Sequence, residues 1–569
     1  MKTLTLQKLG LTLTSFTALG FATSSPAAAA TFRSIDGYGN NIANPTWGKA
    51  NTQLIRLLPP AYEDGISASA GADRPSARAI SNAVASQSDS VTNSLGVSDW
   101  LWQWGQFLSH DLDLTQSHNP LEPFNIPVPT GDPWFDPFNT GTQEILRDRS
   151  RYDPATGTGI GNPRQQINQV TSYMDASQVY GSDPTRASFL RTNDGTGKLK
   201  TSAGNLLPFN TALLPNDQFI DEPLLPSFFI AGDVRANEQI GLTATTTMFV
   251  REHNRLADEI AAADPTLSDE EIYQRARKIV SAQIQAITYN EFLPLLLGEG
   301  ALREYSGYDD TVNASLSNEF ATAAFRVGHT MLSPELQRLN NDGTSPGSIT
   351  QRDALFNTNA ILDEGIDSLL LGLASQEAQE IDTLIINEVR NVLVGPPGVA
   401  GLDLAAFDIQ RGRDHGLPSY NQARIGLGLS AVTSFADITS EVSIQERLAS
   451  IYDSVDDIDL WIGGLAENHF NGGIVGELFH TIIADQFSRT RDGDRFFYLN
   501  DDDLLSLAPD IGSTTLSDII RRNSTITNIQ DNAFVVAKDV PEPSAIFSLL
   551  VLGALGVGSR LKRKIKGAS

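Results

Sequence analysis

The chain has no cysteine among its 569 residues. This absence excludes disulfide bonds, iron–sulfur clusters, cysteine-ligated zinc and thiol nucleophiles. Histidine is also scarce, so a metal site or a proton-transfer site has few candidates. The seven histidines are His110, His118, His253, His329, His415, His469 and His480.

Positive charge is also in short supply. The sequence has 41 Lys and Arg against 68 Asp and Glu, which gives a formal net charge of -27. Because such a surface repels phosphate backbones, we expect no nucleic-acid partner. With 40% hydrophobic and 19% charged residues, the composition is that of a globular protein and excludes a wholly disordered chain.

Residues 1–30 are typical of a secretory signal peptide. Lys2 and Lys8 form a positive region, an apolar run follows as far as Ala22, and the small residues 27–30 suit cleavage. The alternative is an N-terminal membrane anchor, but the apolar run is short for that and rich in Thr and Gly. We therefore expect this segment to direct export.

Residues 539–569 resemble a PEP-CTERM sorting signal. Pro541-Glu542-Pro543 precedes an apolar stretch, 545–559, and a basic cluster, 560–566. In Gram-negative and cyanobacterial surface proteins such a signal implies transient membrane contact, cleavage by an exosortase-type enzyme, and a periplasmic, cell-surface or extracellular location. A permanent tail anchor is the alternative, although the apolar stretch would span only about 22 Å as a helix, less than a crossing of roughly 20 residues.

The region between these ends, residues 31–538, has no fixed-period repeat and no long low-complexity linker, which indicates one large domain. Apolar residues recur at helical spacing through much of it, and alternating strand patterns are scarce. The sequence therefore predicts a mainly α fold with long connections and very little β structure.

Four segments have the clearest helix patterns. The strongest begins with Ser268 and Glu271, which form a capping-box pattern before an apolar series that ends near Pro294. The other three are a helix capped by Ser98 and running toward Asp111, one from about Thr243 to Leu256, and one over Phe320–His329.

Four short segments combine histidine, arginine and carboxylate side chains. Gln106 and His110 are four residues apart, so they share one face of the predicted helix. A single histidine on such a face is more often a buried structural residue than a catalytic one, so only the segments together are informative. They are Trp104–Asp111 (WGQFLSHD), Ala231–Gln239 (AGDVRANEQ) with Arg251–Arg255 (REHNR), Ala324–Thr330 (AFRVGHT) and Asp408–Gly416 (DIQRGRDHG).

In this order the segments resemble those of the animal-type haem peroxidases in the peroxidase–cyclooxygenase superfamily, in particular its bacterial peroxicin-like branch. The likeness extends from Phe32 to Phe534 and includes 58–65 (LPPAYEDG), 457–464 (DIDLWIGG) and 491–495 (RDGDR). It implies a single mainly α domain with haem b sandwiched between central helices. It also implies a secreted peroxidase that reduces hydrogen peroxide and oxidises bromide, iodide, thiocyanate or phenolics through an oxo-ferryl intermediate.

The resemblance assigns roles to four side chains. His329 would be the proximal iron ligand and His110 the distal acid–base residue. With a pKa of about 6.5, an imidazole can take a proton from the inner peroxide oxygen and deliver one to the outer oxygen at neutral pH. Arg235 matches the distal arginine, which stabilises negative charge on the departing oxygen. Gln106 would line the same pocket and hold water or a halide.

The chain departs from the family pattern at the partner of the proximal histidine. The family usually has an asparagine there, and this chain has Asp408. A carboxylate acceptor gives the imidazole more imidazolate character, so we expect a lower ferric/ferrous potential than asparagine would give. Arg326 and Arg411 match positions near the haem propionates and the proximal face, where they would pair with carboxylates.

Haem attachment is the second departure. Mammalian members form two ester bonds, from an aspartate just before the distal histidine and a glutamate after the distal arginine. Glu238 is present, but the aspartate position is Ser109, so we expect at most one ester. Gln239 stands where the chloride-oxidising member has the methionine of its sulfonium link. Fewer electron-withdrawing links predict a milder oxidant that oxidises chloride poorly at neutral pH.

A calcium site is expected beside the haem pocket. Because a helix turns by roughly 100° per residue, Asp111 points away from the pocket face of its helix. A later segment, TSYMDAS, resembles the family's calcium loop, and oxygen ligands of this kind suit Ca²⁺ better than Mg²⁺. The ligands would be Asp111, Thr171, the carbonyl of Tyr173, Asp175 and Ser177.

Two other functions are compatible with the same fold. A fatty-acid dioxygenase needs a tyrosine a few residues before the proximal histidine, and residues 324–328 contain none. A non-catalytic extracellular matrix protein would suit the sorting signal but would not need the motif side chains. The remaining histidines are expected to be structural hydrogen-bond partners (His253 and His415) or surface and packing residues (His118, His469 and His480).

Overall fold

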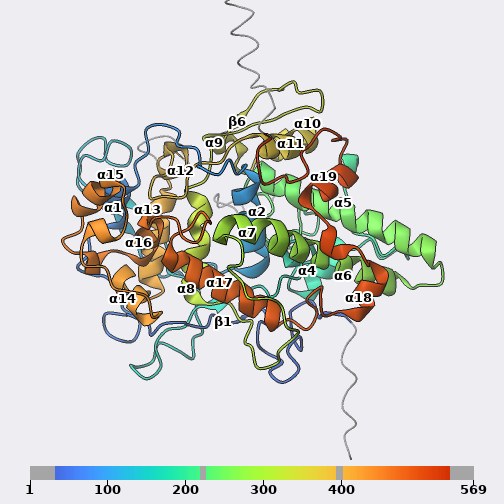
Figure 1. Ribbon diagram of the computed structural model, residues 1–569, viewed down its shortest axis with the longest axis horizontal. Helices are drawn as coiled ribbons and strands as arrows, with labels where there is room; N and C mark the ends of the chain where they lie inside the picture. The colour runs from blue at the N-terminus through green and yellow to red at the C-terminus, as the bar shows by residue number, and fades with distance from the viewer. Residues whose placement is uncertain (1–31, 218–225, 393–400, 538–569) are drawn as a thin grey trace, which may run out of the picture. The chain divides into compact units, whose positions relative to one another are not determined.

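The computed structural model describes residues 32–217, 226–392 and 401–537 (Figure 1). The predicted signal peptide and sorting signal lie outside these residues. From Arg33 onward the described residues form one compact unit. No helix within them is long and apolar enough to cross a membrane.

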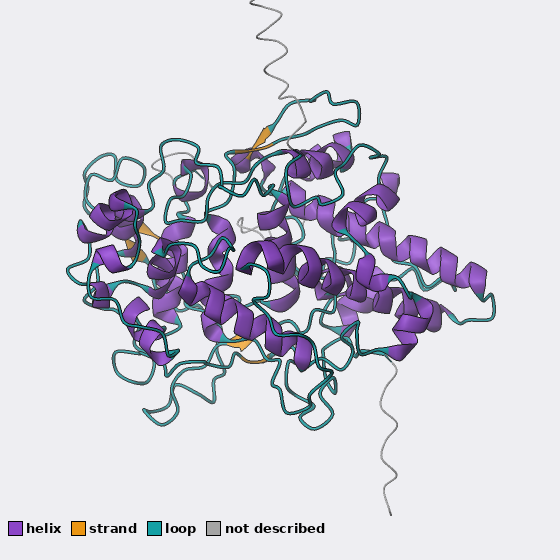
Figure 2. Cartoon of the chain, in the orientation of Figure 1, coloured by secondary structure: helices purple, strands orange, loops and turns teal. Residues whose placement is uncertain are grey.

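Helices dominate the described structure, which confirms the predicted mainly α fold (Figure 2). Each strand is two residues long, and the strands pair into three separate antiparallel ladders. The pairs are β1 (Thr52–Gln53) with β4 (Ile167–Asn168), β2 (Ile126–Pro127) with β3 (Glu144–Ile145), and β5 (Glu335–Leu336) with β6 (Ile349–Thr350).

Three long helices organise the site: α2 (Trp100–Leu112), α5 (Ile240–Ala263) and α6 (Asp269–Ile287). α5 packs against both α2 and α6. The capping box of α6 is present, because the Ser268 hydroxyl accepts from the Glu271 N–H and the Glu271 carboxylate accepts from the Ser268 N–H. The helical path then continues through a π-helical turn, η2 (Thr288–Phe292), into α7 (Leu293–Leu297).

Helix α2 is buried on most of its surface. Trp104 and Phe107 are fully buried, and Phe107 stacks on Phe249 of α5 with 5.1 Å between ring centroids. The helix begins at Trp100, so Asp99 rather than Ser98 directly precedes it, and the Asp99 side chain makes no capping hydrogen bond. The Ser98 hydroxyl nevertheless accepts from the Trp100 N–H at 3.3 Å, as a capping side chain does, and it also donates to the Ala533 carbonyl at 2.6 Å, which ties the start of α2 to the end of the domain.

The predicted helix over 320–329 is broken in two. α8 (Asn318–Thr322) ends at Ala323, whose backbone leaves the helical region (φ -131°, ψ -67°). The chain then winds as a 3₁₀ helix, η3 (Ala324–His329). The tighter winding changes the direction in which His329 projects compared with a continuous α-helix.

The other helices surround this centre. α13 (Leu404–Asp414) lies beside η3, packs against α1 (Ala77–Val84), and is capped by the Asp403 carboxylate. The remaining elements are α3 (Ser177–Tyr180), α4 (Pro184–Leu190), η1 (Ala203–Asn205), α9 (Gln351–Ala354), α10 (Thr358–Glu364), α11 (Asp367–Ser375), α12 (Asn387–Arg390), α14 (Tyr420–Gly426), η4 (Phe435–Asp437), α15 (Val442–Ala449), η5 (Val455–Asp457), α16 (Leu460–Ala466), α17 (Glu477–Asp492), α18 (Asp502–Leu507), η6 (Ile511–Ser513) and α19 (Leu516–Asn523).

Candidate functional site

The first cluster combines α2 with the loop that leads into α5. His110 is 5% exposed and lies between two carboxylates from that loop. Its Nε2 is 3.3 Å from a Glu238 oxygen, and its Nδ1 is 3.6 Å from Asp233. The structure therefore brings together His110 and Glu238, which belong to segments that are far apart in the sequence.

Arg235 is held rigidly in this cluster. Its Nε and one terminal nitrogen donate to the two oxygens of Asp233, each at 2.8 Å, and the same terminal nitrogen donates to the Asp113 carbonyl at 2.7 Å. Burial raises the pKa of Asp233, but the charge and hydrogen bonds of Arg235 outweigh it and hold the pKa below its ordinary value. Asp233 was not predicted as a site residue, although it lies two positions before Arg235 in the same motif.

Glu238 completes this first cluster. Its side chain is 36% exposed. Burial raises its pKa, but the hydrogen bond from His110 and the charges of His110, Arg235 and His329 together lower it below the ordinary value. The elements that carry the two imidazoles are neighbours, because α2, which contains His110, packs against η3, which ends at His329.

The second cluster lies where η3 meets α13. His329 Nδ1 is 2.5 Å from Asp408 Oδ2, and because a carboxylate only accepts, Nδ1 carries the proton. Among the described residues nothing hydrogen-bonds to His329 Nε2, and the side chain is 25% exposed. Asp408 is buried and lies 3.5 Å from Arg326 through its other oxygen. The ring is thus fixed on one side and available as a ligand on the other.

Three arginines gather beside this cluster with too few acceptors. Arg326 is 3.5 Å from both Asp408 and Asp113. Burial and the charges of Arg326 and Arg147 lower the pKa of Arg411 to about 9. Arg411 Nε and one terminal nitrogen of Arg147 are buried without a hydrogen-bond partner, although that Arg147 nitrogen lies 3.9 Å from Asp414. Buried guanidinium donors that lack an acceptor suit an anionic ligand. Arg147 was not predicted, and no motif in the sequence marks it.

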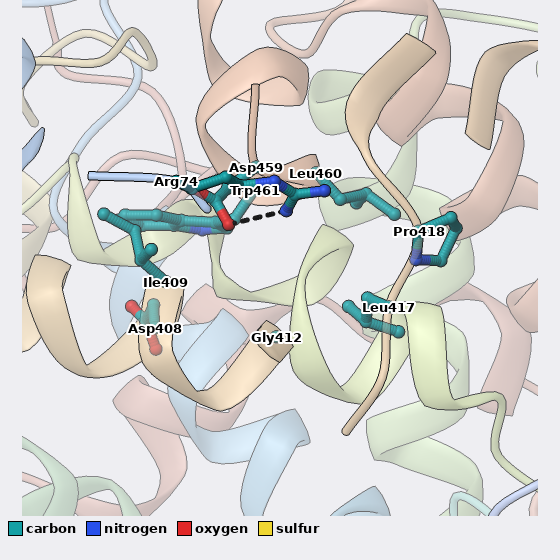
Figure 3. A pocket seen from close by; sticks show the side chains of 9 residues that line it. All are labelled: Arg74, Asp408, Ile409, Gly412, Leu417, Pro418, Asp459, Leu460 and Trp461. Atoms are coloured by element: carbon teal, nitrogen blue, oxygen red, sulfur yellow. Dashed lines mark hydrogen bonds and ion pairs between the residues drawn. The ribbon is translucent and has the colours of Figure 1, made fainter. Parts of the chain in front are cut away.

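A small cavity adjoins Asp408 behind α13 (Figure 3). Its volume of about 10 Å³ has room for about one water molecule. The DIDLWIGG stretch closes it: Asp459 pairs with Arg74 and, through two bonds of 2.9 and 2.8 Å, with Arg413 of α13. Trp461 Nε1 is buried without a hydrogen-bond partner. Through Asp459 and Arg413, this stretch is hydrogen-bonded to α13, the helix that carries Asp408.

The predicted calcium ligands also come together. The Asp111 carboxylate accepts from the backbone N–H groups of Ala176 (3.1 Å) and Ser177 (2.5 Å). The Thr171 hydroxyl donates to Asp175 at 3.0 Å. Burial, and then the charge of Asp175, raise the pKa of Asp111 well above its ordinary value, and burial raises that of Asp175.

This cluster fits a cation through its oxygen chemistry. Asp175 Oδ2 accepts no hydrogen bond and lies 3.5 Å from Arg277. Thr171 Oγ1 also lies 3.4 Å from the Tyr173 carbonyl, and the Ser177 hydroxyl donates to the Asp111 carbonyl. Across the described ranges no group of three or more His, Asp or Glu side chains could hold a metal, so a cation here would depend on hydroxyl and carbonyl oxygens as well as the two carboxylates.

Two further motif histidines are structural, as predicted. His253 is buried and contacts the Tyr180 hydroxyl and the Gly197 carbonyl, each at 2.9 Å. His415 contacts Asn318 at 2.7 Å and Ser150 at 2.8 Å. Burial lowers the pKa of both imidazoles, so both are neutral hydrogen-bond partners.

Comparison with known proteins agrees with this arrangement. A family model described as animal haem peroxidase matches residues 32–534. Peroxinectin A of Dictyostelium discoideum is 39% identical over 516 residues, 88% of this chain and 95% of that protein. The solved structure of peroxidase A from the same organism is 37% identical with a TM-score of 0.83, over 89% of this chain and 99% of that one.

A fatty acid alpha-dioxygenase from Arabidopsis thaliana also matches, with a TM-score of 0.74 over 90% of this chain and 84% of that one. At 21% identity this likeness concerns the fold alone. The family match, by contrast, spans nearly all the described residues and includes both clusters. The chain therefore belongs to the animal haem peroxidase family and is a peroxidase-type oxidoreductase with haem as its cofactor.

Proposed function

We propose that this protein is an exported peroxidase that reduces hydrogen peroxide and oxidises small anionic or aromatic donors. The pairing of two imidazoles from separate elements supports this most strongly. His329 keeps Nε2 available because Nδ1 donates to Asp408. His110 lies on α2, which packs against η3, and its Nε2 is 3.3 Å from Glu238.

The residues present fit a haem. The unpaired buried donors of Arg411 and Arg147, with Arg326 beside them, suit the two propionates of a porphyrin. His329 Nε2 would bind the iron, which supplies the redox chemistry that cleaves peroxide. Bromide, iodide, thiocyanate and phenolics are the donors we expect.

The chain's own groups would manage protons and charge. His110, whose Nε2 is 3.3 Å from Glu238 and whose Nδ1 is 3.6 Å from Asp233, would accept the proton of incoming peroxide and return it to the departing oxygen. Arg235 remains cationic because the charge of Asp233 outweighs burial and raises its pKa, so it would stabilise negative charge as that oxygen leaves. Gln106, one turn before His110, would face the same pocket.

Purified holoprotein tests this function directly. We expect a Soret band and peroxide-dependent oxidation of guaiacol and bromide, with chloride oxidised more slowly than bromide at pH 7. Oxygen consumption with a long-chain fatty acid would indicate a dioxygenase instead. A Soret band without turnover of any donor would indicate a non-catalytic matrix protein.

Export is the second part of the proposal. Residues 1–30 would direct secretion, and residues 539–569 would be cut by an exosortase-type enzyme after transient contact with the membrane. The mature domain would then act in the periplasm, at the cell surface or outside the cell.

Replacing Asp408 by asparagine should raise the ferric/ferrous potential. The buried carboxylate accepts from His329 at 2.5 Å, and a neutral amide would accept less strongly. If the two hydrogen bonds differ by about 1 kcal/mol in how well they stabilise the ferric state, the potential should rise by about 40 mV for one electron. Spectroelectrochemical titration measures this. Asp414→Asn removes the same charge from α13 without contacting His329 and should shift the potential less; an unchanged potential in Asp408→Asn would contradict the proposed tuning.

We further propose that Ca²⁺ binds at Asp111, Thr171, Tyr173, Asp175 and Ser177. A cation would relieve the repulsion between the two buried carboxylates and would fix the end of α2 that carries His110. Chelation should therefore alter the Soret band and lower stability, by about 3 kcal/mol relative to calcium at a hundred times its dissociation constant. Calcium-saturated chelator is the control. A Soret band that is unchanged after complete calcium removal would disprove the coupling.

We also propose one ester between Glu238 and the haem. Its partly exposed carboxylate faces the pocket beside His110, whereas Ser109 offers no carboxylate. After peroxide turnover, part of the haem should resist acid extraction from the wild-type protein, and all of it should be extractable from Glu238→Gln. Mass spectrometry of proteolytic haem peptides should reveal one link, and two links would contradict this.

A further inference from the structure

The side-chain amide of Gln239 can adopt only one orientation. Gln239 precedes α5, and its Oε1 accepts from the backbone N–H of Gly241 at 2.6 Å. Because a backbone N–H only donates, the amide oxygen must face Gly241, and the amide nitrogen must face the other way. That nitrogen donates to Gln103 Oε1 at 2.5 Å and to Gln106 Oε1 at 2.9 Å.

This orientation also determines that of Gln106. Its Oε1 accepts from Gln239 and, at 3.5 Å, from Gln103. Its Nε2 is therefore on the opposite side of the amide group, and it has no acceptor among the described residues. Gln106 is partly exposed and lies one turn from His110 on the same helix face. Two N–H donors are thus left for a ligand in the pocket of His110.

The backbone at the start of α5 lies very close to the side-chain amides of Gln103 and Gln239. A Cβ atom at Gly241 would lie 2.6 Å from Gln103 Oε1 and 2.9 Å from Gln239 Oε1. Both contacts are far shorter than van der Waals separation, so any larger residue would displace the two amides. The absence of a side chain at Gly241 therefore leaves room for the hydrogen bonds that orient Gln106.

We propose that Gln239 is a positioning residue that holds Gln106 as a hydrogen-bond donor toward anions in the distal pocket. This deepens the proposed function and rests on it, since it concerns the pocket assigned to peroxide and small anionic donors. A donating amide stabilises a bound anion, whereas an amide that presented its oxygen would repel one. Without Gln239 both orientations of Gln106 become accessible, and the preference for anions falls.

Fluoride binding to the ferric holoprotein, followed by the Soret band, tests the proposal without turnover. In Gln239→Glu the new carboxylate can accept from Gly241 but cannot donate, so Gln106 turns its nitrogen toward position 239. We expect the fluoride dissociation constant to rise by about tenfold, the loss of one charge-assisted hydrogen bond. Gly241→Ala, which adds no charge, should raise it in the same direction.

The same substitution made in a Gln106→Leu protein distinguishes a change in the orientation of Gln106 from simple repulsion of fluoride by the new carboxylate. In a Gln106→Leu protein, Gln239→Glu should change the dissociation constant by less than about twofold, because the donor is already absent. An equal rise in both backgrounds, or no rise in either, would overturn the positioning role. A wild-type protein without peroxidase activity would refute the proposed function, and the fluoride cycle would still decide whether Gln239 orients Gln106.

Discussion

A protein in which alanine replaces His329 should fold but retain no haem. The imidazole is the one group in its cluster with a free ligand atom, because Asp408 and the neighbouring arginines offer either a carboxylate already paired or donors alone. We expect loss of the Soret band, loss of peroxide turnover, and a cost of about 1–3 kcal/mol for the buried carboxylate that loses its partner.

Two comparisons make this experiment specific. His469→Ala removes a partly exposed imidazole that contacts the Ile381 carbonyl, and it should keep the full Soret band. His329→Gly with added imidazole should regain part of the band, because the free base can occupy the vacated position. A His329→Ala protein with a normal Soret band and normal turnover would refute the proposed ligand.

A protein in which alanine replaces His110 should bind haem normally but react slowly with peroxide. Arg235 and Glu238 would remain in place, since Asp233 fixes the guanidinium independently of the imidazole. Loss of the acid–base group should reduce the second-order rate constant for peroxide by about 10²- to 10⁴-fold. Stopped-flow measurement of the Soret change gives this constant.

The matched control is another buried histidine. His253→Gln removes an imidazole from α5 that contacts Tyr180 and Gly197 and none of the site groups. It should lower stability and leave the peroxide rate close to that of the wild type. A His110→Ala rate within about threefold of wild type would show that the proton is handled elsewhere.

Local signals explain which elements were predictable. The capping box of α6 depends on Ser268 and Glu271 alone, so the sequence sufficed. The capping hydroxyl of Ser98 also follows from local sequence, since it accepts from the Trp100 N–H, whereas its second bond, to Ala533, joins residues that are distant in the sequence. The break between α8 and η3 at Ala323 had no such signal, because residues 318–325 contain no glycine or proline to mark it.

The residues of the candidate site also fall into those that the sequence could locate and those that only the fold reveals. Residues inside the four motifs could be located from the sequence, and the structure places His110 beside Glu238 and His329 beside Asp408. Asp233 could have been found from the sequence, because it is the acid two positions before Arg235 in the same motif. Arg147 could not, because its role depends on which cations the fold brings together. The sequence shows only that Gln239 stands where a relative has methionine. Its contact with Gln106 depends on the direction of its side-chain amide, which only the structure gives.

His110 and Asp111 are consecutive residues with opposite surroundings, since one side chain enters the pocket and the other anchors the segment that ends at Ser177. One peptide bond thus joins the reactive imidazole to its anchor. A single-residue insertion or deletion within α2 would rotate both side chains by roughly 100°, so neither could be realigned without moving the other. Variation in chain length is therefore expected to fall in the surface loops, and the register of this helix must stay constant.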